Sequence, residues 1–169
     1  MIENGEDPLF VLRRMAIFAS EDIGNAAPEA LGLVVHAKNA FEFTGMPEGL
    51  LILTQTVIAL ASFPKSNAVL NAMKKAQKLV HIHGALLIPL HLRNADTALM
   101  RQLEFGKDYH YPHDDREFLK QDFLPDKIKD EILYEPRNIG REEKIKLWLD
   151  ERRKQKTSYR KKHNNDRDE

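Results

Sequence analysis

The sequence predicts an all-α fold, in which a bundle of helices is followed by a loop-rich segment after residue 105. Apolar residues recur with a period near 3.6 over most of the first 80 residues, which is the spacing that places them on one helix face. Single prolines and glycines separate these periodic segments, at positions where helices begin and end. Segments of roughly 12 to 17 residues with short connections are typical of antiparallel helix pairs, so we expect the helices to stack in that way.

The first two helices are marked by residues that favour helix ends. We expect the first helix over Pro8–Ala19, because Asp7 can accept hydrogen bonds from the free amides of its first turn and proline is favoured there. The second helix is expected from Pro28 to about Phe43, where Gly45 ends it. Its apolar residues fit a helical period better than the alternation of a strand.

The next two helices differ in character. The third, from Pro47 through Leu60, is apolar almost all round, which predicts a central helix contacted on several sides. The fourth, from Lys65 to about Val80, is amphipathic, and we expect Ser66 or Asn67 to cap it. Its outward residues are lysines: Lys74, Lys75 and Lys78.

The middle of the chain is less regular. Ala85–Leu92 is apolar but contains Pro89, which breaks a helix interior or a central strand, so we interpret it as a packed connection. Asn94 is placed to cap a short helix over Ala95–Leu103. The stretch from there to Pro136 is rich in proline and aspartate, which predicts turns and short helices.

The last part of the chain divides into a helix and a charged tail. A terminal helix is expected from Gly140, so that residues 1–150 form one helical domain. Residues 152–162 contain seven Lys and Arg and no acid, and an acidic and polar end follows them. Such blocks of like charge repel, so we expect residues 151–169 to be a disordered basic tail.

The composition excludes several classes of protein. The 26 Lys and Arg residues are balanced by 26 Asp and Glu, so the total charge does not favour nucleic acid. The chain has no Cys, which excludes disulfides, thiolate metal sites and a Cys nucleophile. Its longest apolar run, Gly49–Ala61, is shorter than the roughly 20 residues of a membrane-spanning helix. We therefore expect a cytoplasmic protein without membrane contact.

Nucleotide binding has no motif in this chain. A phosphate cradle needs clustered glycines followed by Lys and Ser or Thr, and the eight glycines here stand singly. The pair Lys65-Ser66 follows Phe63-Pro64 without any glycine. We therefore expect the chain to bind neither ATP nor Mg²⁺ and to have no catalytic residues.

Two other groups of polar residues are weak candidates for chemistry. Glu21 and Asp22 are adjacent, and adjacent residues on a helix do not face each other, so a structural role is favoured over acid and base catalysis. Histidines with neighbouring aspartates suggest metal ligands, but their spacing matches no metal motif, and ordinary hydrogen-bonded histidines are favoured. These residues are His81, His83, His91, His110, His113, Asp114 and Asp115.

The lysine face of the fourth helix and several basic residues outside it are candidates for DNA contact. Lys and Arg bind phosphates by displacing counterions, and Tyr159 in the tail is able to stack on a base. An alternative function is therefore a DNA-binding module that contacts single-stranded or forked DNA through helix faces and the tail. The candidate residues outside the lysine face are Lys65, Arg93, Arg101, Arg152, Arg153 and Lys154.

Several strings of residues, in this order, resemble the C-terminal region of the replication-associated recombination protein A family, also called RarA or MgsA. The resemblance covers about Ile2 to Ile145. The strings are Gly5–Phe10 (GEDPLF), Phe18–Gly24 (FASEDIG), Phe63–Ala68 (FPKSNA), Ile88–Ala95 (IPLHLRNA), Tyr111–Asp114 (YPHD), Phe123–Pro125 (FLP) and Tyr134–Pro136 (YEP).

Members of that family are AAA+ ATPases of DNA replication, recombination and repair, and their eukaryotic counterpart is the Werner-helicase-interacting protein. The resemblance implies a fold similar to the helical C-terminal domain of clamp-loader subunits, which assembles the ATPase into a homotetramer. It also implies activity at stalled forks, DNA and single-strand-binding protein as partners, and a nucleoid-associated location in bacteria. ATP and Mg²⁺ would then bind to an N-terminal domain that this chain does not include.

The position of the first string makes us expect a piece of a longer protein or one product of a split gene, because relatives continue there from the AAA+ lid. Under this interpretation the chain is a non-catalytic oligomerisation domain. The candidate interface residues lie in the first helix: Leu9, Phe10, Leu12 and Phe18. The alternative, that they complete the core of one copy, is equally compatible with the pattern.

Overall fold

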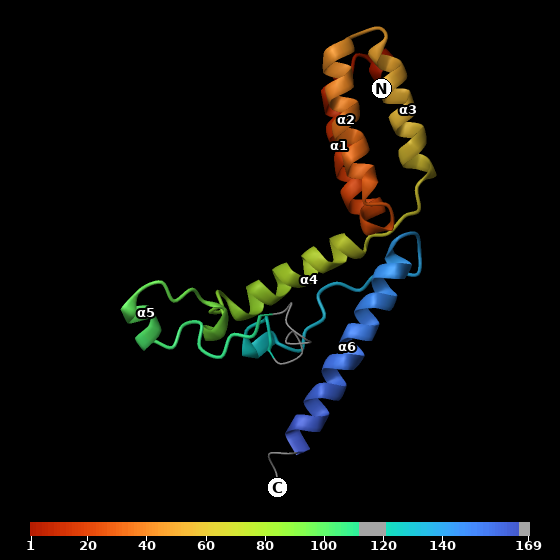
Figure 1. The fold of residues 1–169 in the computed structure, drawn as a ribbon. Helices are drawn as coiled ribbons and strands as arrows, with labels where there is room; N and C mark the ends of the chain where they lie inside the picture. The colour runs from red at the N-terminus through yellow and green to blue at the C-terminus, as the bar shows by residue number, and fades with distance from the viewer. Residues whose placement is uncertain (112–120, 166–169) are drawn as a thin grey trace. The chain divides into compact units, whose positions relative to one another are not determined.

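A computed structural model describes the backbone of residues 1–111 and 121–165 and the side chains of this range up to residue 160. The regular elements in it are all helical, which confirms the predicted fold class (Figure 1). Short 3₁₀ and π turns connect longer helices. The α-helices are α1 (Pro8–Phe18), α2 (Glu29–Thr44), α3 (Gly49–Ser62), α4 (Ala68–His83), α5 (Ala98–Gln102) and α6 (Glu142–Asn165).

The chain divides into two compact units. The first unit consists of Met1–Lys75 and Leu133–Leu147, and the second of Ala76–Ile132 and Trp148–Glu169. Helices α4 and α6 therefore each contribute residues to both units. The domain boundary that we expected at residue 150 falls inside α6.

Helix α1 begins as the sequence predicts. The side chain of Asp7 accepts a hydrogen bond from the backbone N–H of Leu9 at 3.0 Å, and Pro8 occupies the first helical position. A π-helical turn over Ala19–Ile23 follows α1 directly and ends at Gly24, whose φ is 52°. A side chain at this glycine would be strained and would meet the carbonyl oxygen of Ser66.

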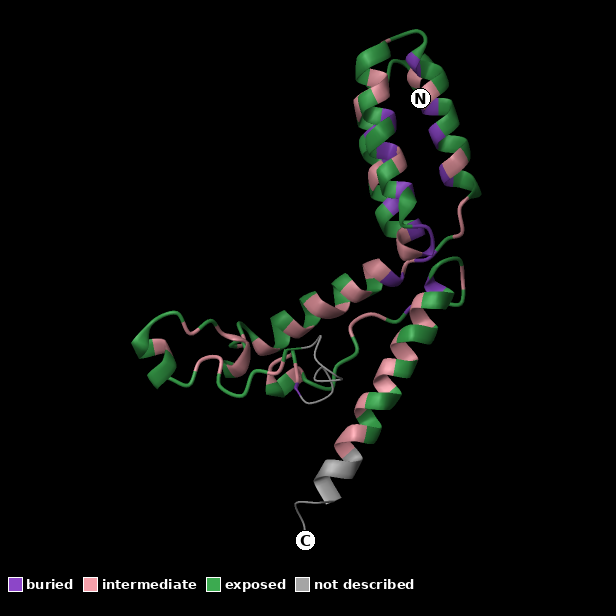
Figure 2. Ribbon diagram, viewed as in Figure 1, coloured by how far each residue is buried: buried purple, intermediate pink, exposed green. Residues whose placement is uncertain are grey.

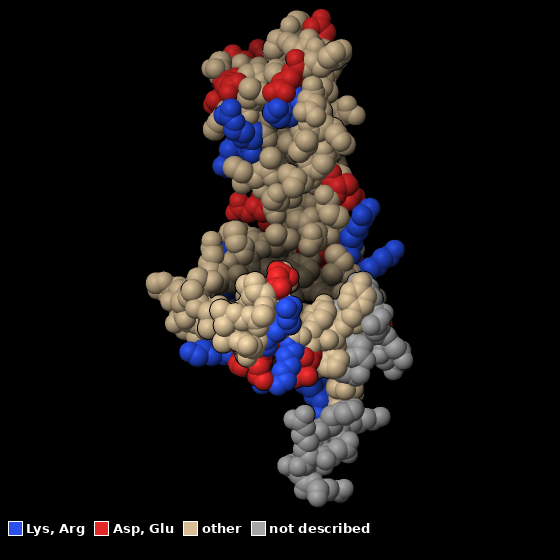
Figure 3. Space-filling model, turned by 60° about the vertical axis from the view of Figure 1, so that its left-hand side comes forward, with Lys and Arg blue, Asp and Glu red and all other residues tan. Residues whose placement is uncertain are grey.

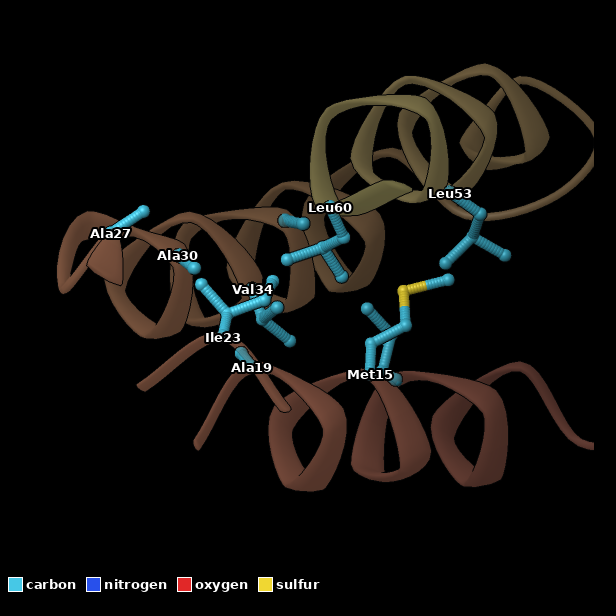
Figure 4. Packing of buried hydrophobic residues seen from close by; sticks show 10 residues of the cluster. Met15, Ala19, Ile23, Ala27, Ala30, Val34, Leu53 and Leu60 are labelled. Carbon is cyan, nitrogen blue, oxygen red and sulfur yellow. The ribbon is translucent and has the colours of Figure 1, made fainter. Parts of the chain in front are cut away.

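The core of the first unit lies between α1, the π turn, α2 and α3. Figure 4 shows Met15 of α1 and Leu53 of α3 pointing toward one another. Many of the buried residues are alanines, which allow the helices to approach closely. The core comprises Leu12, Met15, Ala19, Ile23, Ala27, Ala30, Val34, Ala37, Leu53 and Leu60.

Helix α3 is not the central helix that its apolar sequence predicted. Its inner face packs mainly on α2 through Leu53 and Leu60, whereas its other face is open, with Leu51 75% and Ile58 60% exposed (Figure 2). The all-round apolar pattern shows only that the helix needs cover. It does not show whether the residues that pack on the helix come from the same chain or from another. In the described part of the chain, only the face with Leu53 and Leu60 is packed.

Capping explains where α4 and α5 begin. Ser66 caps α4, as one of the two predicted alternatives, by accepting a hydrogen bond from the N–H of Ala68 at 3.2 Å. Helix α5 is shorter than predicted because Thr97, not Asn94, caps it. The side chain of Arg101 donates a hydrogen bond to the carbonyl oxygen of Ala95 at 3.1 Å. This carbonyl precedes α5 and is therefore paired with a side chain.

The prediction of a disordered tail is wrong for the residues that the structure describes. Helix α6 continues through Asn165, and its basic side chains contact acids that lie far away in the sequence. Lys156 pairs with Asp122 at 2.8 Å, and Arg160 pairs with Asp130 at 3.0 Å and also with Asp122. The composition of residues 151–169 reflects only local charge and carries no information about these distant acidic partners.

Candidate assembly interface

The largest departure from an ordinary soluble helix is the outer face of α3. Helix α3 has no Lys, Arg, Asp, Glu or His in its 14 residues. By contrast, Figure 3, which is turned toward the side of α1 and α2, shows charged side chains among the uncharged residues of the first unit. Exposed apolar surface such as that of Leu51, Val57 and Ile58 marks a contact site more often than a solvated one. We define the outer face as its exposed residues: Leu50, Leu51, Thr54, Gln55, Val57, Ile58, Ala61 and Ser62.

The hydroxyl groups of the outer face are already hydrogen-bonded within the helix. Thr54 donates to the carbonyl oxygen of Leu50 at 2.8 Å, and Ser62 donates to that of Ile58 at 2.8 Å. Burying a polar group is costly when it loses its hydrogen bond to water without replacement. Because these two donors keep their partners, covering Thr54 and Ser62 with another apolar surface has a small desolvation cost, and Gln55 is the polar residue of the outer face that would need a partner in a contact.

Lys65 closes the end of α3. Its ammonium group donates to the carbonyl oxygens of Leu60 at 2.9 Å and Ala61 at 3.1 Å, and also to that of Phe63. The same ammonium lies 5.6 Å from the centre of the Phe18 ring. A cation at a helix C-terminus stabilises the last carbonyls. Lys65, a predicted DNA contact, is therefore engaged inside the first unit.

An apolar groove lies elsewhere on the first unit, between the end of α1, α2 and the first turns of α4. It has a volume of about 420 Å³, and Ser20 and Glu21 are its polar residues. Ala16 also lines a smaller hollow of about 150 Å³ between α1 and α2, which Arg13 and Lys38 border. The apolar residues of the groove are Ala16, Ile17, Leu31, Val69, Leu70 and Met73.

The predicted interface residues of α1 have different surroundings. Leu12 is 3% exposed and belongs to the core, so it offers no surface to a second copy. Leu9 and Phe18 are half-buried against the same core, and Phe10 is 40% exposed. The apolar sequence of Leu50–Leu60 indicates surface that needs cover, but the candidate interface residues lie on α1 and do not include the outer face of α3.

A buried carboxylate fixes the start of α6 in the first unit. Glu142 is fully buried and accepts hydrogen bonds from the Ser66 hydroxyl at 2.7 Å, the Tyr134 hydroxyl at 2.9 Å and the Arg137 backbone N–H at 2.8 Å. Burial, together with the hydrogen bond to Glu142, raises the pKa of Tyr134 to about 12, although the bond from Asn25 acts in the opposite direction. This network joins segments of the chain and has a structural role.

Gly140 allows this joint to close. It has a φ of 56°, and a Cβ atom there would lie 2.3 Å from the carbonyl oxygen of Ala26. The same carbonyl accepts the backbone N–H of Arg141 at 2.9 Å. Only glycine combines this backbone conformation with so close an approach.

Two predicted DNA contacts in the second unit are engaged with their own surroundings. Arg93 donates through Nε to the carbonyl oxygen of Ile88 at 2.7 Å, and its guanidinium lies 5.0 Å from the centre of the Phe105 ring. Arg101 donates to backbone carbonyls ahead of α5. Both side chains therefore hold loops of the second unit in place.

The basic residues of α6 are placed on different sides of the helix. The Arg152 guanidinium lies 5.1 Å from the ring centre of Trp148, which is 56% exposed. Arg153 pairs with Asp150 at 3.5 Å, whereas Lys154 is exposed. The sequence pattern alone did not indicate that Trp148 would be exposed beside a cation.

The histidines do not form a metal centre in the described part of the chain. There, no three His, Cys, Asp or Glu side chains come together in a way that could hold a metal ion. His91 contacts the backbone carbonyl oxygen of Asp122 through Nε2 at 2.8 Å. His113, Asp114 and Asp115 lie outside the described residues.

None of the helices in the described part of the chain combines the length and the apolar content needed to cross a bilayer.

Comparison with known proteins gives consistent matches. The family described as MgsA AAA+ ATPase C terminal matches residues 1–153. The replication-associated recombination protein A of Coxiella burnetii is 45% identical over 156 residues, which are 91% of this chain and 36% of that protein. The protein of the same name from Escherichia coli K12 is 40% identical over 156 residues, covering 89% of this chain and 35% of that protein.

A eukaryotic relative matches a shorter stretch. The ATPase WRNIP1 of Dictyostelium discoideum is 39% identical over 137 residues, which are 80% of this chain and 16% of that protein. The chain therefore spans about a third of the length of the two bacterial relatives and less of the eukaryotic one.

Proposed function

Because the chain belongs to the MgsA AAA+ ATPase C-terminal family, we propose that it is a non-catalytic domain that joins copies of a RarA/MgsA-like protein into homotetramers. Two of its relatives carry the name replication-associated recombination protein A, and we assign the same setting to this chain. Stalled forks are the expected site of action, and single-strand-binding protein is an expected partner.

The outer face of α3 is the observation that supports this proposal. Fully burying a large apolar side chain contributes about 1.5–3 kcal/mol. Leu51 and Ile58 are mostly exposed, and the hydroxyls around them keep their hydrogen bonds when water is removed. A second copy of the same chain is always present at equal concentration, and homo-oligomers are the commonest way to cover such a face.

The chemistry of the family is assigned to another part of the protein. A Walker-type phosphate loop is absent from the 169 residues, so ATP and Mg²⁺ would be bound by the AAA+ region of a relative. The chain contributes no catalytic residue under this proposal.

Light scattering of the native chain over a range of concentrations tests the proposal. We expect a mass of four chains, and a single-chain mass at every concentration would refute it. Ile58→Asp places a charge on the outer face and is expected to lower the mass. Ile82→Asp is the matched control, because Ile82 is 58% exposed on α4, outside this face, and its substitution should leave the mass unchanged.

A second candidate function is contact with single-stranded or forked DNA through α6. The observation that favours it is exposed Trp148 beside Arg152 on a helix that carries a run of basic residues. Aromatic rings and guanidinium groups stack on bases irrespective of sequence. Fluorescence anisotropy with labelled single-stranded and forked DNA tests it, and no binding at low salt would exclude it.

A further inference from the structure

We propose that the contact between copies joins two different surfaces: the outer face of α3 in one copy lies in the apolar groove of the first unit of the next copy. This inference rests on the proposed function, since it names the surfaces that the assembly uses. It differs from a symmetric contact, in which the outer faces of two α3 helices would meet each other.

The groove has the chemistry of a helix-binding surface. Ile17, Leu31 and Met73 are exposed on it although they are large and apolar. Glu21 is its only charged residue. Amphipathic or apolar helices bind grooves of this kind through side chains spaced about three or four residues apart. Leu51, Thr54 and Ile58 of the outer face have this spacing, and the Thr54 hydroxyl is already bonded within its own helix.

Helix α3 is the only α-helix in the described part of the chain whose exposed side chains carry no charge. The described helices α1, α2, α4, α5 and α6 each expose at least one Lys, Arg, Asp or Glu. Placing an unpaired charge in an apolar groove is strongly unfavourable. The outer face of α3 from a second copy brings no charge into the groove, and Glu21, the charged residue that lines the groove, is itself exposed.

The partner helix must come from another molecule. In its own chain, the inner face of α3 is fixed against the core by Leu53 and Leu60, which are both buried. The outer face therefore points away from the core of its own unit. A groove is concave and does not fill a second groove, whereas a helix face does.

A contact between two different surfaces has a defined consequence for assembly. Each copy offers one α3 face and one groove, so copies join head to tail, and the chain of copies ends only when it closes into a ring. In the tetramer that we propose, four equivalent junctions close the ring. Blocking either surface on every copy removes every junction.

Mixing two blocked variants tests the inference. Ile58→Asp blocks the α3 face and leaves the groove, whereas Met73→Asp blocks the groove and leaves the α3 face. Each variant alone is expected to have the mass of one chain. An equimolar mixture has one intact pair of surfaces and is expected to give a mass of two chains and no more. Leu31→Asp, at a second position of the groove, should behave like Met73→Asp.

The outcomes separate this inference from the proposed function. If the native chain forms tetramers but the mixture stays at the mass of one chain, the head-to-tail contact is wrong and the proposed function stands. Native-sized assembly of either groove variant alone would also overturn the inference. If the native chain is monomeric at every concentration, the proposed function itself fails. Dimers in the mixture require both variants to be folded, so a folding defect cannot imitate the expected result.

Discussion

The hydroxyl of Ser66 donates a 2.7 Å hydrogen bond to the carboxylate of Glu142, which lies 76 positions further along the chain. The same serine caps α4, and the same carboxylate accepts from Tyr134 and from the backbone of Arg137. A single pair of residues therefore ties the start of α4 to the start of α6 within the first unit.

Replacing Glu142 with alanine is expected to destabilise the chain strongly. The substitution removes the acceptor of the buried Ser66 hydroxyl and of the partly buried Tyr134 hydroxyl and Arg137 N–H. A buried polar group left without a partner costs about 1–3 kcal/mol. We expect the free energy of unfolding in urea to fall by about 3 kcal/mol or more. Glu143→Ala, at the exposed neighbouring position, should change it by less than about 0.5 kcal/mol. Equal losses in the two variants would contradict the role of the network.

Replacing Gly140 with alanine tests the close approach at the same joint. The new Cβ atom would lie 2.3 Å from the carbonyl oxygen of Ala26, so the backbone must move in addition to the strain of a positive φ. Gly5→Ala is the matched control, because Gly5 has the left-handed helical conformation with a φ of 86° but nothing lies within 4 Å of its added Cβ atom. The control should cost about 1 kcal/mol, and Gly140→Ala clearly more. Thermal unfolding compares the two, and similar melting temperatures would contradict the clash.

These predictions indicate which parts of the fold could be derived from sequence. The cap of α1 was predictable because Asp7 acts on an amide only two residues away. The network of Glu142 and the pairing of Lys156 were not, because their partners are separated by many residues and no local pattern indicates them. The disorder expected for the tail failed for the same reason.

The candidate site was predictable in kind but not in position. A charge-free helix from Gly49 indicated surface that needs cover, yet periodicity cannot distinguish cover from the same chain and cover from another. The interface was therefore expected on α1, where Leu12 instead completes the core. The family resemblance was confirmed by the match over residues 1–153, whereas its likeness to clamp-loader subunits stays a prediction.

The ion pairs of Asp122 give the stability a specific dependence on pH. Partial burial disfavours the ionised form of Asp122, but Lys156 and Arg160 outweigh this effect and hold its pKa below the ordinary 3.8. Because the folded pKa is below the unfolded one, the contribution of Asp122 is present above about pH 4 and is lost as the pH falls through the folded pKa. Asp122→Asn should therefore lower the free energy of unfolding at pH 7 and have no effect well below the folded pKa.

Urea unfolding of the native chain and Asp122→Asn between pH 2 and about pH 7 measures this difference. The control is Glu104→Gln, which removes the acid of the exposed pair with Lys107. Exposed ion pairs contribute little, so its effect should be small at every pH. A difference for Asp122→Asn that stays constant over the whole range would refute the assignment.

Trp148 is the only tryptophan of the chain, so its fluorescence reports directly on the second candidate function. If bases stack on Trp148 beside Arg152, adding oligothymidylate should quench this fluorescence, and Trp148→Ala should weaken binding about tenfold. Arg153→Gln, at a position already paired with Asp150, should weaken it less. The affinity should fall with salt with a slope shallower than the value of about −5 for seven phosphate contacts, because acids already pair with Lys156 and Arg160. Binding without quenching would mean that the DNA contacts basic side chains alone and that Trp148 has no part in it.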